Sequence, residues 1–230
     1  MGGQLAIISS MATRHILVEL ADVYTKSTGV AVVVESVGGV DAVRRIREGD
    51  PFDLAVLAAD ALAKLGEEGF AQADSIRPFA RSPAAVAVRS GAARPTTCDE
   101  PSIRGLVGRA RAIGISTGPS GAGVRALLAL WSRGNGASPR IVQAQPGVPV
   151  ARLIADGSVD VGFQQLSELL GELGIDIVGV VPETLLQKTT FSVGICRSTA
   201  QTAHARALIA FFTSTNSGSA KRRFGMEQCE

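Results

Sequence analysis

Aromatic residues are scarce in this sequence, which has one Trp, one Tyr and eight Phe among its 230 residues. It also lacks any run of the roughly 18 uninterrupted apolar residues that a membrane-spanning helix needs, so we expect no membrane insertion. The three cysteines, Cys98, Cys196 and Cys229, are odd in number and widely spaced. This spacing predicts neither a disulfide framework nor a zinc site, and we expect reduced thiols and neither a metal nor a cofactor.

Charge of one sign is not in excess either. The sequence has 23 basic and 21 acidic residues, a net charge of +2, and the basic residues are scattered among acids. Without a basic stripe that could follow phosphates, a nucleic-acid partner is not indicated. No basic segment followed by an apolar one precedes the first predicted strand, so we see no export signal. We expect a cytoplasmic protein if Met1 is the native start and a periplasmic one if a leader was removed. Of the two locations we favour the cytoplasm.

What the sequence does contain is typical of a folded globular protein. Apolar residues make up 46% of it, charged residues only 19%, and it has 26 Gly and 10 Pro. These proportions indicate a protein rich in turns rather than a disordered or fibrous chain. The length alone allows one large domain or two small ones.

Strand and helix patterns alternate along the chain, which predicts βαβ units with right-handed crossovers in a parallel sheet. In the first half, the predicted strands are residues 5–9, 31–36 and 53–60, with a helix after each. In the second half, the predicted strands are 111–117, 139–145 and 159–165, with helices at 121–134 and 148–158. Further apolar runs cover 174–182 and 189–196, and helices are predicted from about 204 to 212 and near residue 220.

The segment 81–95 reads as a crossing between the two halves. We therefore predict two α/β lobes, each a mixed, mostly parallel sheet flanked by helices. Residues 1–81 with 193–230 would form the first lobe, and residues 82–192 the second.

Four of the junctions that follow predicted strands are short and either polar or rich in glycine. They are Ser9-Ser10-Met11-Ala12-Thr13, Ser36-Val37-Gly38-Gly39, Ser116-Thr117-Gly118-Pro119-Ser120-Gly121 and Gln164-Gln165-Leu166-Ser167. Ligands of open α/β sheets bind at the carboxyl ends of strands. A helix N-terminus there offers unpaired N–H groups and about half a positive charge, so these junctions predict an anion site. The candidate ligand-binding residues are Ser9, Ser10, Met11, Ala12, Thr13, Arg14, Gly38, Gly39, Ala58, Thr117, Ser120, Gly121, Val148, Gln164 and Gln165.

Each junction also has a simpler interpretation. Ser9 or Ser10 can be an ordinary helix N-cap, and Gly38-Gly39 can be turn glycines. The segment 117–123 lacks the lysine of a phosphate-binding P-loop and the glycine spacing of a dinucleotide fingerprint, although its small residues suggest a close backbone approach. Gln164 and Gln165 are adjacent in a strand, so at most one of them should face the ligand.

Charged candidates also allow both a functional and a simpler interpretation. His15 is one of only two histidines, and it can be a surface residue or a proton-transfer group. Arg14 and Arg125 can bind carboxylates through two parallel hydrogen bonds or can lie in solvent. Glu35 and Glu168 read as ordinary acids of a strand end and a helix.

The chain resembles the molybdate-binding proteins of bacterial transport systems and their relatives among type II periplasmic solute-binding proteins. The residues that carry the resemblance extend over nearly the whole chain, and a Gly-x-x-Asp-x-Gly-Phe pattern lies at Gly157, Asp160, Gly162 and Phe163. The similar segments are ESVGGVDAVRRIREGDPFDLAVLAAD, LAKLGEEGF, SPAAVAVR, IGISTGPSGAGVRALLALW and VARLIADGSVDVGFQQLSE. The resemblance implies two lobes joined by a hinge of two strands, with a ligand cleft between the lobes.

Three positions depart from the pattern of that family. Its ligand-binding hydroxyls fall near Ala12 and Gly39 here, and its tyrosine is replaced by Gln165. The smaller residues favour a larger anion than molybdate, such as a di- or tricarboxylate, bound with help from Thr13, Arg14, His15, Ser120 and Gln165. Some relatives of the group look like aconitate isomerases, which move a proton along an unsaturated tricarboxylate.

Two functions follow as hypotheses. The first is a solute-binding protein for a small anion, most simply a di- or tricarboxylate and otherwise molybdate or another tetrahedral oxyanion, with an ABC transporter permease as partner if the protein is exported. The second is a cytoplasmic isomerase of the aconitate isomerase type, with His15 as general base because the ordinary pKa of histidine lies near working pH.

Overall fold

The computed structural model describes residues 3–132 and 139–229, and the chain divides into two compact units. Unit 1 comprises Met1–Ser82 and Thr190–Glu230, and unit 2 comprises Pro83–Thr189. The predicted boundaries, after residues 81 and 192, fall one and three residues from these divisions. Residues 133–134, the end of one predicted helix, and Met1 lie outside the described residues.

Unit 1 contains a six-stranded sheet with the strand order β11-β4-β10-β3-β1-β2. Its strands are β1 (Gln4–Ser10), β2 (Ala31–Val37), β3 (Leu54–Ala58), β4 (Arg77–Ser82), β10 (Thr189–Ile195) and β11 (Glu227–Gln228). Its α-helices are α1 (Arg14–Thr28), α2 (Gly39–Arg47), α3 (Ala59–Glu67), α8 (Thr202–Thr213) and α9 (Gly218–Arg223), with 3-10 turns η1 (Met11–Thr13), η2 (Ala73–Ser75) and η3 (Thr215–Ser217).

Unit 2 contains a five-stranded sheet with the strand order β7-β6-β8-β5-β9. Its strands are β5 (Ala84–Arg89), β6 (Ala112–Ile115), β7 (Arg140–Gln143), β8 (Val161–Gln165) and β9 (Ile175–Val180). Its helices are α4 (Glu100–Arg109), α5 (Pro119–Trp131), α6 (Val150–Ala155) and α7 (Leu166–Leu169).

The two units share one topology. In unit 1, β1 lies between the parallel strands β2 and β3, and β10 runs antiparallel to β3. In unit 2, β6 lies between the parallel strands β7 and β8, and β5 runs antiparallel to β8. Each unit is therefore a mixed α/β sheet with three parallel strands, whose carboxyl ends meet at one edge of that sheet.

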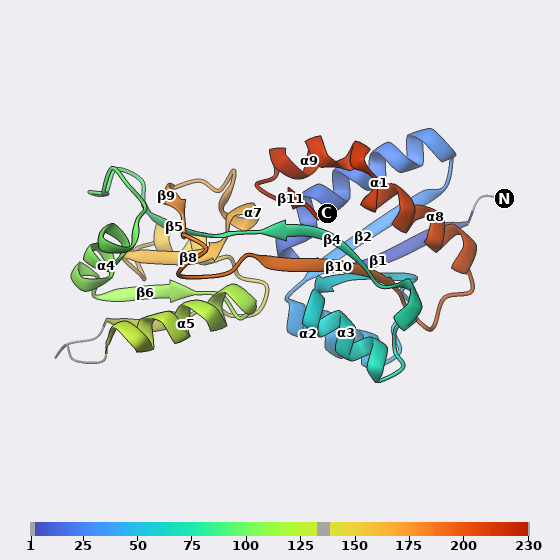
Figure 1. Cartoon of the computed structure of the whole chain (residues 1–230), viewed down its shortest axis with the longest axis horizontal. Helices are drawn as coiled ribbons and strands as arrows, with labels where there is room; N and C mark the ends of the chain where they lie inside the picture. Colours follow the sequence, from blue (N-terminus) through green and yellow to red (C-terminus); the bar gives the residue numbers. More distant parts are fainter. Residues whose placement is uncertain (1–2, 133–138, 230) are drawn as a thin grey trace. The chain divides into compact units, whose positions relative to one another are not determined.

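Strand alternation divides the core of each unit between the two faces of its sheet. In β3, Leu54 and Val56 pack into a cluster with α1 and α8, while Ala55 and Leu57 pack into one with α2 and α3. Figure 1 shows α1, α8 and α9 on one side of the unit 1 sheet and α2 and α3 on the other. Helices covering both faces explain why β3 is apolar at every position.

An aspartate before the third parallel strand fixes the sheet of each unit. Asp53 Oδ2 accepts the backbone N–H of Ala6 at 2.8 Å, and Asp160 Oδ2 accepts that of Arg111 at 2.7 Å. Asp160 also pairs with the Arg111 guanidinium, and this interaction lowers the pKa of the carboxyl to about 2. These contacts tie the start of the third strand to the start of the central strand in each unit.

Five strands and α-helices had no predicted counterpart: α4, α7, β4, β5 and β11, with β5 inside the segment 81–95 that was interpreted as a crossing. The two glycines Gly105 and Gly108 weaken the helical pattern of α4, but Asp99 starts it by accepting the backbone N–H of Ser102 at 2.9 Å. The other four elements have only two to six residues, too short for periodicity to show.

Candidate functional site

The predicted ligand residues of unit 1 gather at one edge of its sheet. Strand register places Ser9 opposite Ser36 of β2 and opposite Val56 of β3. The chain leaves these three strands directly into η1, α2 and α3. Tight strand-to-helix connections therefore bring three helix N-termini to the same edge.

The two serines at the end of β1 have different surroundings. Ser9 is fully buried, and its Oγ lies 2.7 Å from Ser36 Oγ. Ser10 is 8% exposed, and its buried Oγ has no hydrogen-bond partner within the described residues. The side chain of Ser10 caps no helix, so the simple N-cap interpretation is wrong for this residue. A buried hydroxyl without a partner is unusual in folded proteins, which makes Ser10 a strong ligand candidate.

Gly39 leaves room next to Ser10. A Cβ built at Gly39 would have the Cβ of Ser10, at 4.0 Å, as its one neighbour within that distance among the atoms described. Gly39 is the first residue of α2, and Gly38 before it provides no side-chain cap. The N-terminus of α2 therefore faces open space beside an unpaired hydroxyl.

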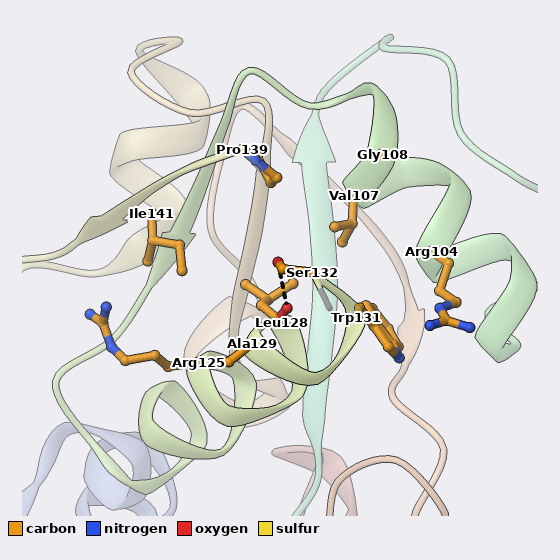
Figure 2. A pocket seen from close by; sticks show the side chains of 10 residues that line it. All are labelled: Arg104, Val107, Gly108, Arg125, Leu128, Ala129, Trp131, Ser132, Pro139 and Ile141. Carbon is orange, nitrogen blue, oxygen red and sulfur yellow. Dashed lines mark hydrogen bonds between the residues drawn. The ribbon is translucent and has the colours of Figure 1, made fainter. Parts of the chain in front are cut away.

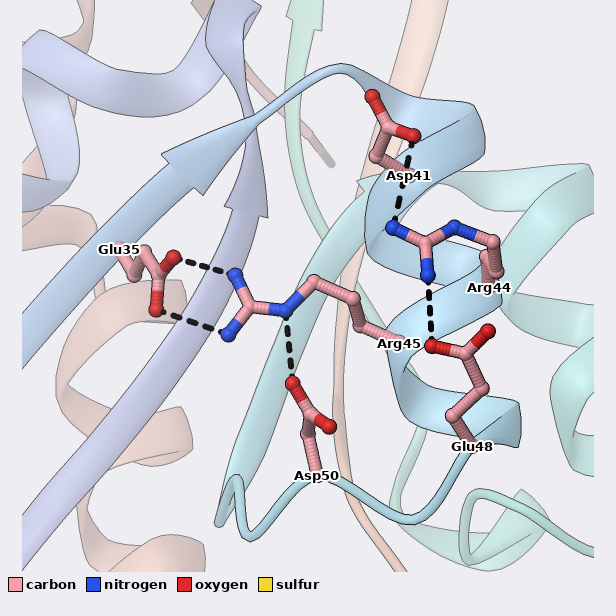
Figure 3. Close-up of polar contacts among 6 residues, drawn as sticks. All are labelled: Glu35, Asp41, Arg44, Arg45, Glu48 and Asp50. Carbon is pink, nitrogen blue, oxygen red and sulfur yellow. Dashed lines mark hydrogen bonds and ion pairs between the residues drawn. The ribbon is translucent and has the colours of Figure 1, made fainter.

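Arg45 holds together the segments on either side of the connection between β2 and α2. Its guanidinium forms hydrogen bonds to both carboxylate oxygens of Glu35 and, at 2.7 Å, to Asp50 Oδ2, as Figure 3 shows. It also lies 5.0 Å from the centre of the Phe52 ring. These interactions raise the pKa of Arg45 above its ordinary value, with the hydrogen bond to Glu35 as the largest cause. Arg45 thus joins the end of β2, helix α2 and the loop before β3 through its contacts with Glu35 and Asp50.

Three helices that begin at strand ends lack side-chain caps. The residues before α2, α3 and α5 are Gly38, Ala58 and Gly118, and none of them accepts a backbone N–H through a side chain. In α4, by contrast, the Asp99 side chain fills this role. First-turn N–H groups without a side-chain acceptor are available to an anion.

The loop after β6 is tightly folded on itself. Ser116 Oγ and Ser120 Oγ are 3.3 Å apart, and Ser120 is buried. A Cβ added at Gly121 would lie 1.9 Å from the backbone oxygen of Ser116, so only glycine fits. The close backbone approach predicted from the small residues is therefore an approach to Ser116.

The two adjacent glutamines at the end of β8 lie on opposite faces of the sheet, as strand alternation predicts. Gln164 Oε1 accepts the backbone N–H of Val150 at 2.8 Å, and its Nε2 donates to Glu168 Oε2 at 2.7 Å. Gln165 Nε2 donates to Thr189 Oγ1 at 2.7 Å, while its buried Oε1 has no partner in the described part of the chain. Both the oxygen and the nitrogen of the Gln164 amide are therefore hydrogen-bonded, whereas the Gln165 oxygen remains available as an acceptor.

Glu168 differs from the ordinary helix acid that the sequence suggested. Burial raises the pKa of its carboxyl to about 7, and the hydrogen bond from Gln164 opposes that shift. The side chain is partly exposed. Glu168 lies in α7, the helix that follows β8, and a carboxyl that titrates near neutral pH is a candidate for proton transfer.

The remaining candidate residues are exposed or already have a hydrogen-bond partner within the protein. The His15 ring is exposed and nearly parallel to the Phe224 ring, at 12° with 6.3 Å between centroids. Arg14 is exposed, and Arg125 donates to Gln143 Oε1 at 2.9 Å. The backbone N–H of Val148 donates to Gln145 at 3.0 Å.

The remaining candidates lie in the junction after β1 and in the loop before α5. Thr13 is fully buried and its hydroxyl donates to the Ser10 carbonyl at 3.1 Å. Met11 and Ala12 form η1 with Thr13. In unit 2, Thr117 is partly exposed in the loop before α5.

A separate cavity in unit 2 is lined by Arg125 but by none of the candidate residues of the strand-end junctions. It has a volume of about 200 Å³ and is mostly apolar. Figure 2 shows Trp131, Leu128 and Val107 around it, with Arg104 next to Trp131. The Arg104 guanidinium lies 5.2 Å from the centre of the Trp131 ring. Ser132 and Pro139 line this cavity next to residues 133–138, outside the described part, so we assign no ligand to it.

Residues 3–132 and 139–229 contain neither a cluster of metal-ligating side chains nor a membrane-spanning helix. No group of three or more His, Cys, Asp or Glu side chains is placed to hold a metal ion there. Within the same residues, no helix combines the length and apolar character needed to cross a membrane.

Thr189, the partner of Gln165, was not among the residues predicted from the sequence. It lies 24 positions after Gln165, at the end of unit 2, and its hydroxyl accepts the hydrogen bond from the Gln165 amide. Its local sequence, TTFSVGIC, signals a strand and nothing more. No pattern in the chain indicates this contact.

Comparison with known proteins gives one family and several relatives. The model of the family described as bacterial extracellular solute-binding protein matches residues 5–227. An aconitate isomerase from a Pseudomonas species is 28% identical over 228 residues, which is 97% of this chain and 87% of that protein.

Solved structures confirm the predicted two-lobed α/β fold class. The periplasmic molybdate-binding protein of Azotobacter vinelandii matches with a TM-score of 0.78 and 22% identity, over 98% of this chain and 100% of that one. PEB3 with bound L-phospholactate matches with a TM-score of 0.71 and 15% identity, over 98% and 100%.

Proposed function

The chain belongs to the bacterial extracellular solute-binding protein family, and we propose that it binds a small di- or tricarboxylate through its strand-end loops. One observation carries this proposal. Two buried side-chain atoms of the described residues lack a hydrogen-bond partner, Ser10 Oγ and Gln165 Oε1. Each ends a parallel strand, one in each unit, at positions predicted to contact ligand.

The donors around these atoms favour an anion. The N-termini of α2, α3 and α5 carry no side-chain caps, and each contributes backbone N–H groups and the positive end of a helix dipole. Glycine at position 39 provides space that a small tetrahedral oxyanion would not need. The L-phospholactate bound by PEB3 combines a carboxylate with a phosphoryl group, which supports an anion larger than molybdate as ligand in this fold.

Calorimetric titration with citrate, cis-aconitate, molybdate and sulfate tests the proposal. We expect heat of binding with at least one carboxylate and weaker binding of molybdate and sulfate. The substitution Gly39→Ala places a methyl group beside Ser10 without a steric clash, so it should weaken carboxylate binding and leave thermal stability unchanged. Gly108→Ala, in open space on α4, is the matched control and should bind like the wild type. Wild-type protein that binds none of the four anions would contradict the proposal.

A second function is favoured by the aconitate isomerase relative. In such a reaction a base removes a proton from the methylene carbon of aconitate, the charge spreads over the allylic carbons and the adjacent carboxylates, and the proton returns at the other allylic carbon. We propose His15 as that base and the helix N-termini as stabilisers of the negative charge. Glu168, with a pKa of about 7, is the competing group.

Interconversion of cis- and trans-aconitate, followed by NMR, separates binding from catalysis. Loss of activity in His15→Ala with binding retained would assign the proton transfer to His15, whereas the same result in Glu168→Gln alone would assign it to Glu168. Binding without any interconversion would leave a solute-binding protein. For that case we propose delivery of the ligand to an ABC transporter permease, which cell fractionation tests, because delivery requires the protein outside the cytoplasm.

A further inference from the structure

Gln165 presents a hydrogen-bond acceptor at the strand-end edge of unit 2, where the uncapped N-terminus of α5 presents donors. The residue is 2% exposed and ends β8. Its Nε2 is committed to Thr189 Oγ1 at 2.7 Å, which directs Oε1 elsewhere. That oxygen is buried and meets no donor among the described residues.

The chemistry of an amide oxygen limits what can satisfy it. An ionised carboxylate or a fully deprotonated oxyanion offers only acceptors, so either one would place two oxygen lone pairs against each other. A hydroxyl group can donate, and it would restore the hydrogen bond that burial has removed from the amide oxygen. The strand-end loops of unit 2 thus provide two kinds of partner: the uncapped N–H groups that begin α5 for a carboxylate, and Gln165 Oε1 for a donor.

We propose that the ligand is a hydroxycarboxylate, and that Gln165 selects it over the same carboxylate without the hydroxyl. This inference rests on the proposed carboxylate-binding function. Thr189 is a positioning residue in this scheme, because its hydroxyl holds the amide in the orientation that turns the oxygen toward the ligand.

Two pairs of ligands test the selection because each pair differs in one hydroxyl: citrate with tricarballylate, and malate with succinate. We expect calorimetric titration of the full chain to give about tenfold tighter binding of the hydroxylated member of the pair that fits the site, the effect of one hydrogen bond. Gln165→Met keeps the length of the side chain but removes the amide, so the ratio of the two dissociation constants should fall to about one. Gln187→Met, the same change at an exposed position of unit 2, should preserve the ratio.

Thr189→Val provides a second readout that a merely structural role would not change. It removes the hydroxyl but keeps the branched shape, so the preference for the hydroxyl should fall while the affinity for tricarballylate or succinate stays within about twofold of the wild type. Thr189→Ser should retain the preference because it keeps the hydroxyl.

Three results would overturn the inference. They are equal affinity of the wild type for both members of each pair, an unchanged ratio in Gln165→Met, and a fall in affinity for all four ligands alike in Thr189→Val. In each case carboxylate binding by the wild type would still support the proposed function. Failure of the wild type to bind any carboxylate would instead contradict the proposed function, and this inference with it.

Discussion

The ammonium group of Lys221 lies 4.7 Å from the centre of the Phe79 ring in the interior of unit 1. The side chain is fully buried, and Nζ donates to the Phe212 carbonyl at 2.9 Å and to Gln228 Oε1 at 2.7 Å. Two carbonyl oxygens and an aromatic face thus surround a cation that has lost its hydration. Helix α9, from which Lys221 projects, is joined in this way to α8, β4 and β11.

This environment predicts a rise in stability at alkaline pH. Burial lowers the pKa of Lys221 from 10.5 to about 8, so between these values the unfolded chain binds more protons than the folded one. The free energy of unfolding should therefore increase from pH 8 to pH 10 more in the wild type than in Lys221→Met. Denaturant unfolding at several pH values measures the difference, with exposed Lys64→Met as control. A parallel pH dependence of the wild type and Lys221→Met would contradict the assignment.

Glu168 predicts the opposite slope at acidic to neutral pH. Its pKa is raised from 4.5 to about 7, so the folded state binds more protons in that interval. The stabilising contribution of this carboxyl is complete below pH 4.5 and is lost as the pH rises through 7. Relative to Glu168→Gln, whose amide oxygen can still accept from Gln164, the wild type should lose stability between pH 5 and pH 8. Chemical unfolding of both proteins tests this, and exposed Glu172→Gln should behave like the wild type.

Gly121 and Gly108 form a matched pair on the two helices α5 and α4. A methyl group at Gly121 would overlap the backbone of Ser116, so Gly121→Ala must displace the strand-end loop, with a loss of about 1–3 kcal/mol or more. Gly108→Ala meets no atom within 4 Å and should stabilise the helix by about 0.5–1 kcal/mol. Thermal and chemical unfolding measure both. Similar stabilities of the two variants would show that the loop after β6 adapts.

Arg45 and Arg44 are adjacent on α2 but differ in surroundings, as Figure 3 shows. Arg45 is 25% exposed and holds Glu35 and Asp50, whereas Arg44 is 56% exposed and pairs with Asp41 and Glu48 on its own helix turn or just beyond it.

Arg45→Met should therefore cost about 1 kcal/mol of unfolding free energy, and Arg44→Met less than about 0.5 kcal/mol. Because Arg45 braces the loop that carries Gly38 and Gly39, only its loss should also weaken ligand binding. Chemical denaturation and citrate titration of both variants provide the test. Equal effects of the two substitutions would contradict a bracing role.

Much of the fold could be predicted because it depends on short-range patterns. The apolar runs 5–9, 31–36 and 53–60 each correspond to a strand, and the helical stripes between them to helices. Helix α4 escaped prediction because its glycines and its single capping aspartate give a weaker signal than an apolar stripe. We predicted that the polar loops after parallel strands lie at the same edge of a sheet. This follows from the parallel topology, because every sequence that forms βαβ units forms parallel strands.

The sequence by itself determined most of the strands and helices and the edge of each sheet at which the polar loops lie, because periodicity and strand alternation act over a few residues. Only the tertiary structure decided which polar atoms are satisfied. Gln164 and Gln165 are chemically identical, yet one finds Val150 and Glu168 while the other finds Thr189 and retains a free oxygen. That difference depends on strand register and on the position of a residue 24 places later in the chain, and both are fixed only when unit 2 folds.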